Sequence, residues 1–192
     1  FISLHENTGG QTMKKLEVLL APAEFETLHK RGLSGVTCVV FDILRATSSI
    51  VTALAAGATA VRPVRTVEEA VRERTRNPDT LLAGERDGFP ITRDISGSID
   101  FDLGNSPREF QKQIVSGRKI VMTTTNGTRA IESCAGASRI VIGSFLNLHA
   151  VIRFLVTSGV EDLLLVCSGT YEEASFEDTL GAGALCSELW GS

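Results

Sequence analysis

The sequence contains no long apolar run, no closely spaced pair of cysteines and no block of basic residues. None of its apolar runs reaches the roughly 18 residues that a membrane-spanning helix needs. Its first residues lack the charged-then-apolar order of a secretory signal. Lys and Arg number 19 against 23 Asp and Glu, so the net charge is −4, which argues against broad binding to nucleic acid or to anionic membranes. We therefore expect a cytoplasmic protein that binds any anion locally.

The four cysteines form no CxxC motif and show no spacing typical of a metal site: Cys38, Cys134, Cys167 and Cys186. Each lies in or beside apolar sequence, so reduced, buried thiols are expected. Residues 1–12 are polar and precede Met13. They are interpreted as a disordered leader or an artefact of the translation start, and an α/β domain is expected over residues 13–192.

Short apolar runs alternate with helical patterns along the rest of the chain. Strands are predicted over 16–20, 36–41, 60–64, 80–83, 120–124, 139–142 and 162–167, and helices over 46–56, 67–76, 108–115, 128–134, 149–156 and 176–189. The segment 84–107 is rich in Gly, Asp, Ser and Pro and is interpreted as a long functional loop. This alternation predicts an α/β fold with a largely parallel or mixed sheet covered on both faces, built as one core or as two lobes.

Polar residues follow the ends of several predicted strands. They are Asp42, Gly84 with Glu85, residues 123–128, Gly143 with Ser144, and Ser168 with Gly169. In parallel sheets, ligands bind outside the carboxyl ends of the strands. We therefore expect these residues to lie together and to form a site.

The segment 123–128 has the sequence TTTNGT and leads from a strand into a helix. A glycine turn in this position is typical of an anion-binding site, because free N–H groups and the helix dipole point at the turn. Thr124, Thr125, Asn126, Gly127 and Thr128 are the expected phosphate ligands, and Ser168 and Gly169 complete the set. In the alternative interpretation, the threonines at 123–125 are ordinary strand residues and Asn126-Gly127 is an ordinary tight turn.

Carboxylates beside a bound anion repel it unless a cation lies between them. Oxygen ligands without a nearby histidine favour Mg²⁺. Asp42 and Glu85 are the first candidates for its ligands, followed by Glu177 and Asp178, which also suit a general base. The alternatives are a turn cap for Asp42 and a capping box with Ser175 for Asp178. Arg45 is either a surface charge or a partner for an oxyanion.

Several phosphate-handling mechanisms can be tested by residue spacing. The motif GxxxxGK[ST] is absent, which excludes a P-loop site. A cysteine phosphatase needs Arg about six residues after its thiol, but Leu44, Ile140 and Glu173 occupy these positions after Cys38, Cys134 and Cys167. Three scattered histidines exclude a histidine-rich dinuclear centre. The Asp-x-Asp pattern of haloacid dehalogenases is half met by Asp42, with Leu44 at the second position.

Six segments together resemble one known family: VVFDILRATSS (39–49), LAGERDG (82–88), FDLGNSPREF (101–110), TTTNGTRAI (123–131), GSFLN (143–147) and CSGTYEEASFEDTLGAGAL (167–185). Each motif is modest alone, but their order is specific for the 2-phosphosulfolactate phosphatase family. Members of that family usually continue beyond the region that matches 181–185, so a C-terminally truncated domain is one expectation.

The resemblance implies a Mg²⁺-dependent acid phosphatase that hydrolyses 2-phospho-3-sulfolactate to 3-sulfolactate and phosphate, a step of coenzyme M biosynthesis. The expected partner is thus a small anionic phospho- or sulfo-acid. A phosphatase for another small phospho-acid and a non-catalytic module that binds an anionic metabolite are the alternatives. The apolar helix over 149–156 suits a homo-oligomer interface as well as a core.

Overall fold

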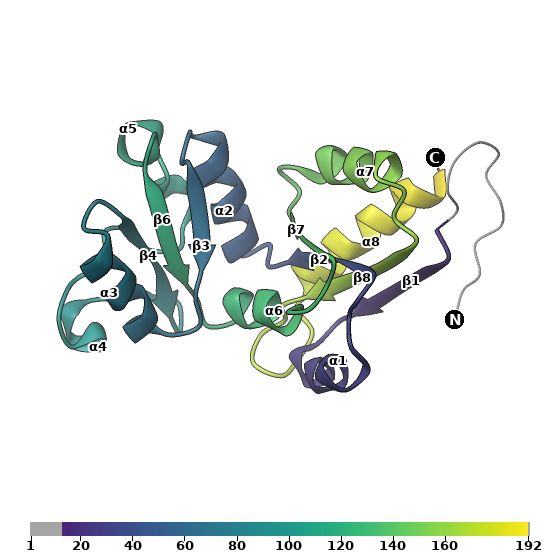
Figure 1. The fold of residues 1–192 in the computed structure, drawn as a ribbon, viewed down its shortest axis with the longest axis horizontal. Helices are drawn as coiled ribbons and strands as arrows, with labels where there is room; N and C mark the ends of the chain where they lie inside the picture. The colour runs from purple at the N-terminus through teal and green to yellow at the C-terminus, as the bar shows by residue number, and fades with distance from the viewer. Residues whose placement is uncertain (1–12, 192) are drawn as a thin grey trace. The chain divides into compact units, whose positions relative to one another are not determined.

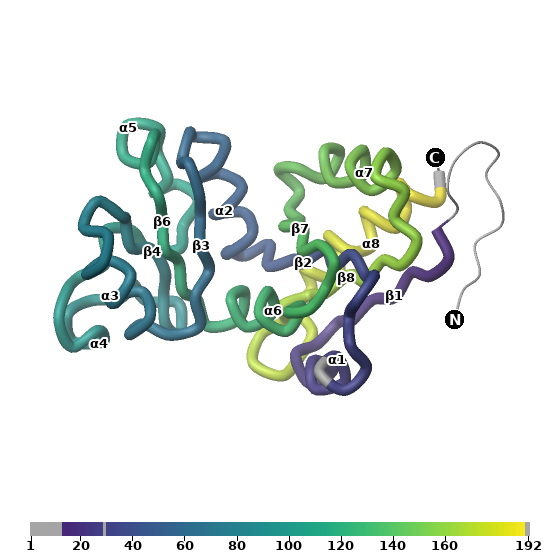
Figure 2. The backbone as a smooth tube through the Cα atoms, in the orientation of Figure 1, coloured from purple at the N-terminus to yellow at the C-terminus, as the bar shows by residue number. Residues whose placement is uncertain are grey.

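A computed structural model describes residues 13–191 of the chain (Figure 1). The expected leader, residues 1–12, lies outside the described residues. The chain divides into two compact units. Unit 1 comprises Phe1–Leu44 and Ala130–Ser192 as far as they are described, and unit 2 comprises Arg45–Arg129. The chain thus leaves unit 1 once and returns to it once, as the trace in Figure 2 shows.

Unit 1 is built on a parallel sheet with the strand order β1 (Lys15–Leu19), β8 (Asp162–Cys167), β2 (Val36–Phe41) and β7 (Arg139–Gly143). Five of the six residues of β2, and of β8, are buried. Such unbroken burial is typical of central strands in a sheet that is covered on both faces. Phe41 pairs with Cys167, so β2 and β8 end side by side.

Alternate residues of β8 enter two different cores. Leu163 and Leu165 pack in a cluster that includes Val151 of α7 (Leu148–Thr157) and Leu185 of α8 (Phe176–Gly191). Leu164 belongs to the second cluster. That cluster also contains residues of α1 (Phe25–Arg31) and α6 (Gly127–Ser133), and the helix η1 (Pro22–Glu24) precedes α1. Because side chains alternate along a strand, the two clusters lie on opposite faces of the sheet.

Unit 2 has a second sheet with the order β3 (Ala60–Pro63), β6 (Lys119–Thr123), β4 (Leu81–Arg86) and β5 (Phe89–Pro90). Its strands are parallel except β5, which pairs with β4 in an antiparallel hairpin. The helices are α2 (Ala46–Ala55), α3 (Val67–Arg76), α4 (Arg93–Ser96), η2 (Pro107–Glu109) and α5 (Lys112–Val115). Ala70 of α3 packs on Leu82 and Val121, and Figure 1 shows α2 on the side of this sheet away from α3.

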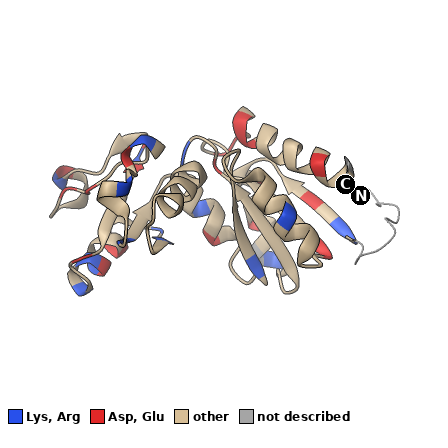
Figure 3. Ribbon diagram, turned by 90° about the horizontal axis from the view of Figure 1, so that it is seen from above, with Lys and Arg blue, Asp and Glu red and all other residues tan. Residues whose placement is uncertain are grey.

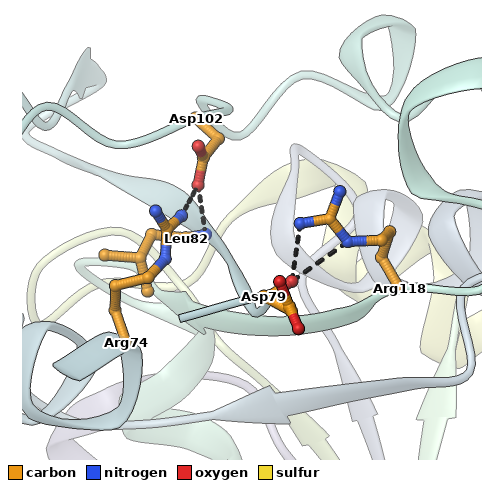
Figure 4. Close-up of polar contacts among 5 residues, drawn as sticks. All are labelled: Arg74, Asp79, Leu82, Asp102 and Arg118. Carbon is orange, nitrogen blue, oxygen red and sulfur yellow. Dashed lines mark hydrogen bonds and ion pairs between the residues drawn. The ribbon is translucent and has the colours of Figure 1, made fainter. Parts of the chain in front are cut away.

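Two arginines fasten loops to the sheet of unit 2, as Figure 4 shows. Asp102 Oδ2 accepts hydrogen bonds from the Leu82 N–H, at 2.7 Å, and from the Arg74 guanidinium of α3. Arg118 donates through Nε and Nη2 to the backbone oxygen of Asp79, at 3.0 and 2.6 Å. The first contact holds the segment around Asp102 against the edge of β4.

The α/β class predicted from sequence is confirmed, and three elements have the predicted bounds: β2, α3 and β8. The single helix predicted over 108–115 is wrong, because η2 ends at Glu109 and buried Phe110 has ψ of 59°, outside the helical region. The loop predicted over 84–107 contains the end of β4, the strand β5 and the helix α4. Helix α1 was not predicted.

The cysteines, the charged residues and the helices can be compared with what the composition predicted. The four cysteines are buried and free, as their apolar surroundings predicted. Acidic and basic residues are interspersed along both units (Figure 3). Over the part of the chain that the structure describes, every helix is too short or too polar to cross a membrane.

Candidate functional site

The carboxyl ends of β4 and β6 in unit 2 are joined by the side chain of Glu85. Its Oε1 accepts a hydrogen bond from the Thr125 N–H at 2.7 Å, and its Oε2 accepts bonds from the Thr125 hydroxyl at 3.1 Å and the Gly88 N–H at 2.7 Å. Glu85 is buried, with 7% of its surface exposed. The sequence prediction that Glu85 lies beside the threonine turn is therefore confirmed.

Gly84 allows Glu85 to reach this position. Its φ is +145°, and a Cβ atom there would lie 1.9 Å from the backbone oxygen of Thr123. Only glycine tolerates both the conformation and the close approach of β6. The strand β4 therefore continues past the point where sequence analysis ended it, and carries Glu85 to the end of β6.

The threonine turn is held by its own side chains. Thr124 Oγ1 accepts a hydrogen bond from the Thr128 N–H at 3.1 Å, and the Thr128 hydroxyl donates to the Thr124 oxygen at 2.7 Å. Both threonines are buried. The predicted start of α6 at this turn is confirmed, but the N–H groups of Thr125 and Thr128, expected to be free for an anion, are used within the protein.

The N–H groups of Asn126 and Gly127 differ from those of the flanking threonines. Neither finds an acceptor within residues 13–191. Of the five turn residues expected to bind phosphate, Asn126 and Gly127 present unused backbone donors, whereas Thr124, Thr125 and Thr128 hold the turn in place. Donors that are fixed and unsatisfied suit an anion, because no internal bond has to break when it binds.

Arg86 supports the same edge, and sequence analysis did not identify it. It donates to the Glu85 backbone oxygen at 2.7 Å and to the Thr123 hydroxyl at 2.7 Å. Its burial lowers the pKa of the guanidinium, while Glu85 and other nearby carboxylates raise it. Arg86 lies in the motif at 82–88, which was the available signal.

In unit 1, Asp178 joins the ends of β2 and β8. Its Oδ1 accepts a hydrogen bond from the Ile43 N–H at 2.7 Å, and its Oδ2 accepts bonds from the Ser168 hydroxyl at 3.0 Å and the Gly169 N–H at 3.1 Å. Burial raises the pKa of Asp178, and these hydrogen bonds partly offset the effect. Ser168 and Gly169, expected to bind phosphate, thus hold Asp178.

The conformation of Gly169 belongs to this arrangement. Its φ is +62°, and a Cβ atom would lie 2.3 Å from the Glu173 backbone oxygen. The capping-box interpretation of Asp178 is wrong, because Ser175 Oγ has no hydrogen-bond partner among residues 13–191 and the Asp178 carboxylate receives donors from two strand ends outside its own helix.

Three further candidates lie near the ends of these elements. Asp42 is buried directly after β2, with 6% of its surface exposed. Glu177 is half-buried in the first turn of α8, and its carboxylate forms no hydrogen bond or ion pair with the described residues. Arg45 is half-buried at the N-cap of α2, in unit 2, and its guanidinium has no ion-pair partner within the same part of the chain.

The predicted residues thus fall into two groups. Unit 2 holds Arg45, Glu85 and the threonine turn, and unit 1 holds Asp42, Ser168, Gly169, Glu177 and Asp178. Within residues 13–191, three or more His, Cys, Asp or Glu side chains nowhere gather closely enough to hold a metal ion. A Mg²⁺ site characteristically uses only one or two carboxylates. The prediction of Mg²⁺ held by Asp42 and Glu85 stays a prediction.

Sequence analysis also missed a buried polar group around the first turn of α2. Thr47, Ser48 and Ser49 are all buried there, and the Ser49 hydroxyl donates to the Asn105 backbone oxygen at 2.9 Å. Asn105 is itself buried, with 5% of its surface exposed. The signal was present in the motifs at 39–49 and 101–110, whose polar residues were used only for the family resemblance.

Comparison with known proteins gives a consistent result. The profile of one protein family, described as 2-phosphosulpholactate phosphatase, matches residues 23–192. A probable 2-phosphosulfolactate phosphatase of Thermotoga petrophila is 48% identical over 153 residues, covering 80% of this chain and 62% of the relative. A protein of the same name from Caldanaerobacter subterraneus subsp. tengcongensis is 44% identical over 168 residues, which covers 86% of this chain and 66% of the relative. Another, from Clostridium perfringens strain SM101, is 38% identical over 179 residues, which covers 91% of this chain and 68% of the relative. The chain spans 62% to 68% of the length of these three relatives.

Proposed function

The chain belongs to the 2-phosphosulpholactate phosphatase family, and we propose that the protein hydrolyses 2-phosphosulfolactate to 3-sulfolactate and phosphate, as a step of coenzyme M biosynthesis. In this reaction, water attacks phosphorus, the phosphorus–oxygen bond to the sulfolactate carbon chain breaks, and a proton passes from water to the leaving alkoxide. The substrate is a small anion. The observation that best supports the proposal is the clamp between Glu85 and Thr125, beside two unused N–H groups.

The clamp supports phosphoryl transfer through preorganisation. Transfer of a phosphoryl group needs positioning and charge stabilisation more than covalent chemistry from the protein. Because Glu85 fixes Thr125, the Asn126 and Gly127 N–H groups are held ready for the oxygens of a phosphoryl group. Arg45, without an ion pair among the described residues, would bind a second anionic group of the substrate, such as the sulfonate or carboxylate.

The residues present suit Mg²⁺, which we propose as the cofactor. The candidate ligands are oxygens, the donors that Mg²⁺ prefers. Glu85 Oε1 accepts one hydrogen bond, from the Thr125 N–H, and so keeps a lone pair for a cation. The proposal assigns Glu85 as the ligand from unit 2, and Asp42, in unit 1, stays the sequence-based prediction for a second ligand. Bound Mg²⁺ would neutralise the charge of the phosphoryl oxygens and of the leaving group.

Two carboxylates of α8 have different roles in the proposal. Asp178 accepts three hydrogen bonds and is buried, so it positions the ends of β2 and β8. Glu177 is half-buried, and its carboxylate has no hydrogen bond or ion pair with residues 13–191, which leaves it available to accept a proton from water. We therefore assign the general base to Glu177.

The proposal is tested by measuring phosphate release from 2-phosphosulfolactate and from a panel of small phospho-acids, with Mg²⁺ and with EDTA. We expect Mg²⁺-dependent release that is fastest with 2-phosphosulfolactate. Faster release from another member of the panel would change the substrate but keep the reaction. Binding of these anions without any release over hours would contradict the proposal and identify a binding module.

A further inference from the structure

Asn105 contains a buried acceptor that the protein does not satisfy. Only 5% of the residue is exposed, and its Oδ1 has no hydrogen-bond partner among residues 13–191. Buried polar atoms in native proteins nearly always have a partner, so each exception calls for a specific reason. None of the roles proposed above involves the Asn105 side chain.

The backbone around Asn105 is fixed from several sides. Leu103 N–H donates to the Leu82 oxygen at 3.1 Å, Gly104 N–H donates to Glu109 Oε2 at 2.7 Å, and the Asn105 oxygen accepts the Ser49 hydroxyl at 2.9 Å. The Asp102 contacts in Figure 4 hold the beginning of the same segment. The unpaired amide is therefore held in place and is not the end of a loose loop.

Backbone contacts also join the segment that carries Asn105 to the strand that carries Glu85. Ala83 and Leu103 form a parallel bridge, and the Gly84 N–H donates to the Gly104 oxygen at 3.1 Å. Glu85 and Asn105 each follow directly after one residue of the hydrogen-bonded pair Gly84 and Gly104. Both residues belong to unit 2, so their relationship lies within one compact unit.

Glu85 and the segment that leads to Asn105 lie on the face of the sheet away from α3. Leu82 packs on α3, so Ala83 and Glu85 face the other way. Asp102 contacts Arg74 of α3, and Leu103, which forms a parallel bridge with Ala83, faces away from α3 as Ala83 does. The Ser49 hydroxyl of α2 donates to the Asn105 backbone oxygen, so Asn105 lies beside α2.

Asn105 Oδ1 and Glu85 Oε1 are both acceptors, and the second keeps a lone pair after its bond to Thr125. Acceptors that lie close together repel each other unless a cation or a donor lies between them. Amide and carboxylate oxygens are hard ligands, which suit a divalent ion such as Mg²⁺. We propose that Asn105 Oδ1 is a ligand of the divalent cation bound by Glu85. The inference rests on the metal site of the proposed function and adds a ligand that lies in the same unit as Glu85.

The test uses Mn²⁺ as a probe, because its free form is counted by electron paramagnetic resonance. The full 192-residue chain is compared with Asn105→Ala, Asn105→Asp and the matched control Asn77→Ala, an exposed asparagine of unit 2. We expect Asn105→Ala to weaken Mn²⁺ binding by about tenfold or more, since loss even of groups outside the metal's ligands costs about 10- to 100-fold. The control should bind as the parent does.

Asn105→Asp gives a second readout that does not depend on the alanine variant. A buried carboxylate without a cation is costly, so Mg²⁺ should raise the Tm of this variant by more than it raises that of the parent. Equal Mn²⁺ affinity for the parent and a folded Asn105→Ala variant would overturn the inference. A Tm of Asn105→Asp that is insensitive to Mg²⁺ would also overturn it, and would indicate a purely structural amide.

The inference and the proposed function fail in different ways. Asn105-dependent Mn²⁺ binding without phosphate release would support the ligand and contradict the reaction. Phosphate release in EDTA from a chain that binds no Mn²⁺ would overturn the ligand and leave hydrolysis standing.

Discussion

Glu85 and Thr125, 40 residues apart in the chain, are joined by two hydrogen bonds, one to the Thr125 N–H at 2.7 Å and one to its hydroxyl at 3.1 Å. This relationship ties the end of β4 to the turn that begins α6. It gives Glu85 a structural role beside the metal-binding role proposed for it. The two roles can be separated by changing Thr125 and leaving Glu85 in place.

Thr125→Val removes the hydroxyl and keeps the backbone bond to Glu85. We expect a loss of about 0.5–1.5 kcal/mol in the free energy of unfolding, the net contribution of a typical hydrogen bond, measured by urea denaturation. The hydroxyl also accepts the Asp87 N–H, at 3.0 Å, so the loss should fall in the upper part of that range. Thr125→Ser keeps the hydroxyl and is the control. A valine variant as stable as the serine variant would show that the clamp rests on the backbone bond alone.

Gly84→Ala should be far more damaging than a similar change nearby. The new Cβ would lie 1.9 Å from the Thr123 oxygen, so β4 and β6 must separate, at a cost of about 3 kcal/mol or more. Gly88→Ala is the matched control, because Gly88 also has a positive φ, +82°, but has open space around it. Its cost should be about 1–2 kcal/mol, the strain of a left-handed conformation. Equal losses of stability in thermal unfolding would contradict the close approach of the two strands.

The raised pKa of Asp178 should make the free energy of unfolding depend on pH. Burial raises its pKa above the ordinary value of 3.8, so the folded state holds its proton more tightly than the unfolded state does. The resulting stability is present below the ordinary pKa and is lost as the pH rises through the raised pKa of the folded state. Asn at this position does not titrate. Above pH 4, the free energy of unfolding of the parent should therefore fall relative to that of Asp178→Asn.

Denaturation of both proteins at a series of pH values measures this difference. A parent that gains stability over the variant as the pH rises would mean that the bonds from Ile43, Ser168 and Gly169 outweigh burial. The pKa of Asp178 would then lie below its ordinary value.

The elements predicted correctly have signals that are local in the chain. Helix α3 carries a capping box, in which the Thr66 hydroxyl accepts the Glu69 N–H at 3.1 Å and Glu69 bonds back to the Thr66 N–H. Strand β8 is a continuous apolar run. By contrast, the predicted helix over 108–115 is interrupted because Glu109 turns back to the N–H groups of Gly104 and Ser106, and Phe110 is buried. The helix propensity of residues 108–115 does not reveal these contacts of Glu109 and Phe110.

The same limit applies to the site. The sequence identified Glu85 and the turn at 123–128, because polar residues follow the strand ends. It did not reveal that the N–H groups of Thr125 and Thr128 are used internally, or that Ser168 and Gly169 donate to Asp178. These bonds connect positions that are far apart or that depend on the exact path of a turn. Asn105 was missed for the same reason, since its unpaired oxygen is defined only by the folded surroundings.

Asp42→Asn tests the electrostatic part of the proposed mechanism. The change replaces a buried carboxyl group by an amide of nearly the same shape. We expect phosphate release to slow by about 100-fold or more, the effect of losing one key electrostatic group. Asp94→Asn, in the short helix α4, is an exposed control that should retain activity. Full activity of the Asp42→Asn variant would show that Asp42 only caps the turn after β2.

The most direct test of the account is a crystal structure of the chain grown with Mn²⁺ and phosphate, in which anomalous scattering locates the metal. We expect Mn²⁺ on the Glu85 carboxylate and a phosphate oxygen on the N–H groups of Asn126 and Gly127. Manganese and phosphate bound away from both Glu85 and this turn would contradict it.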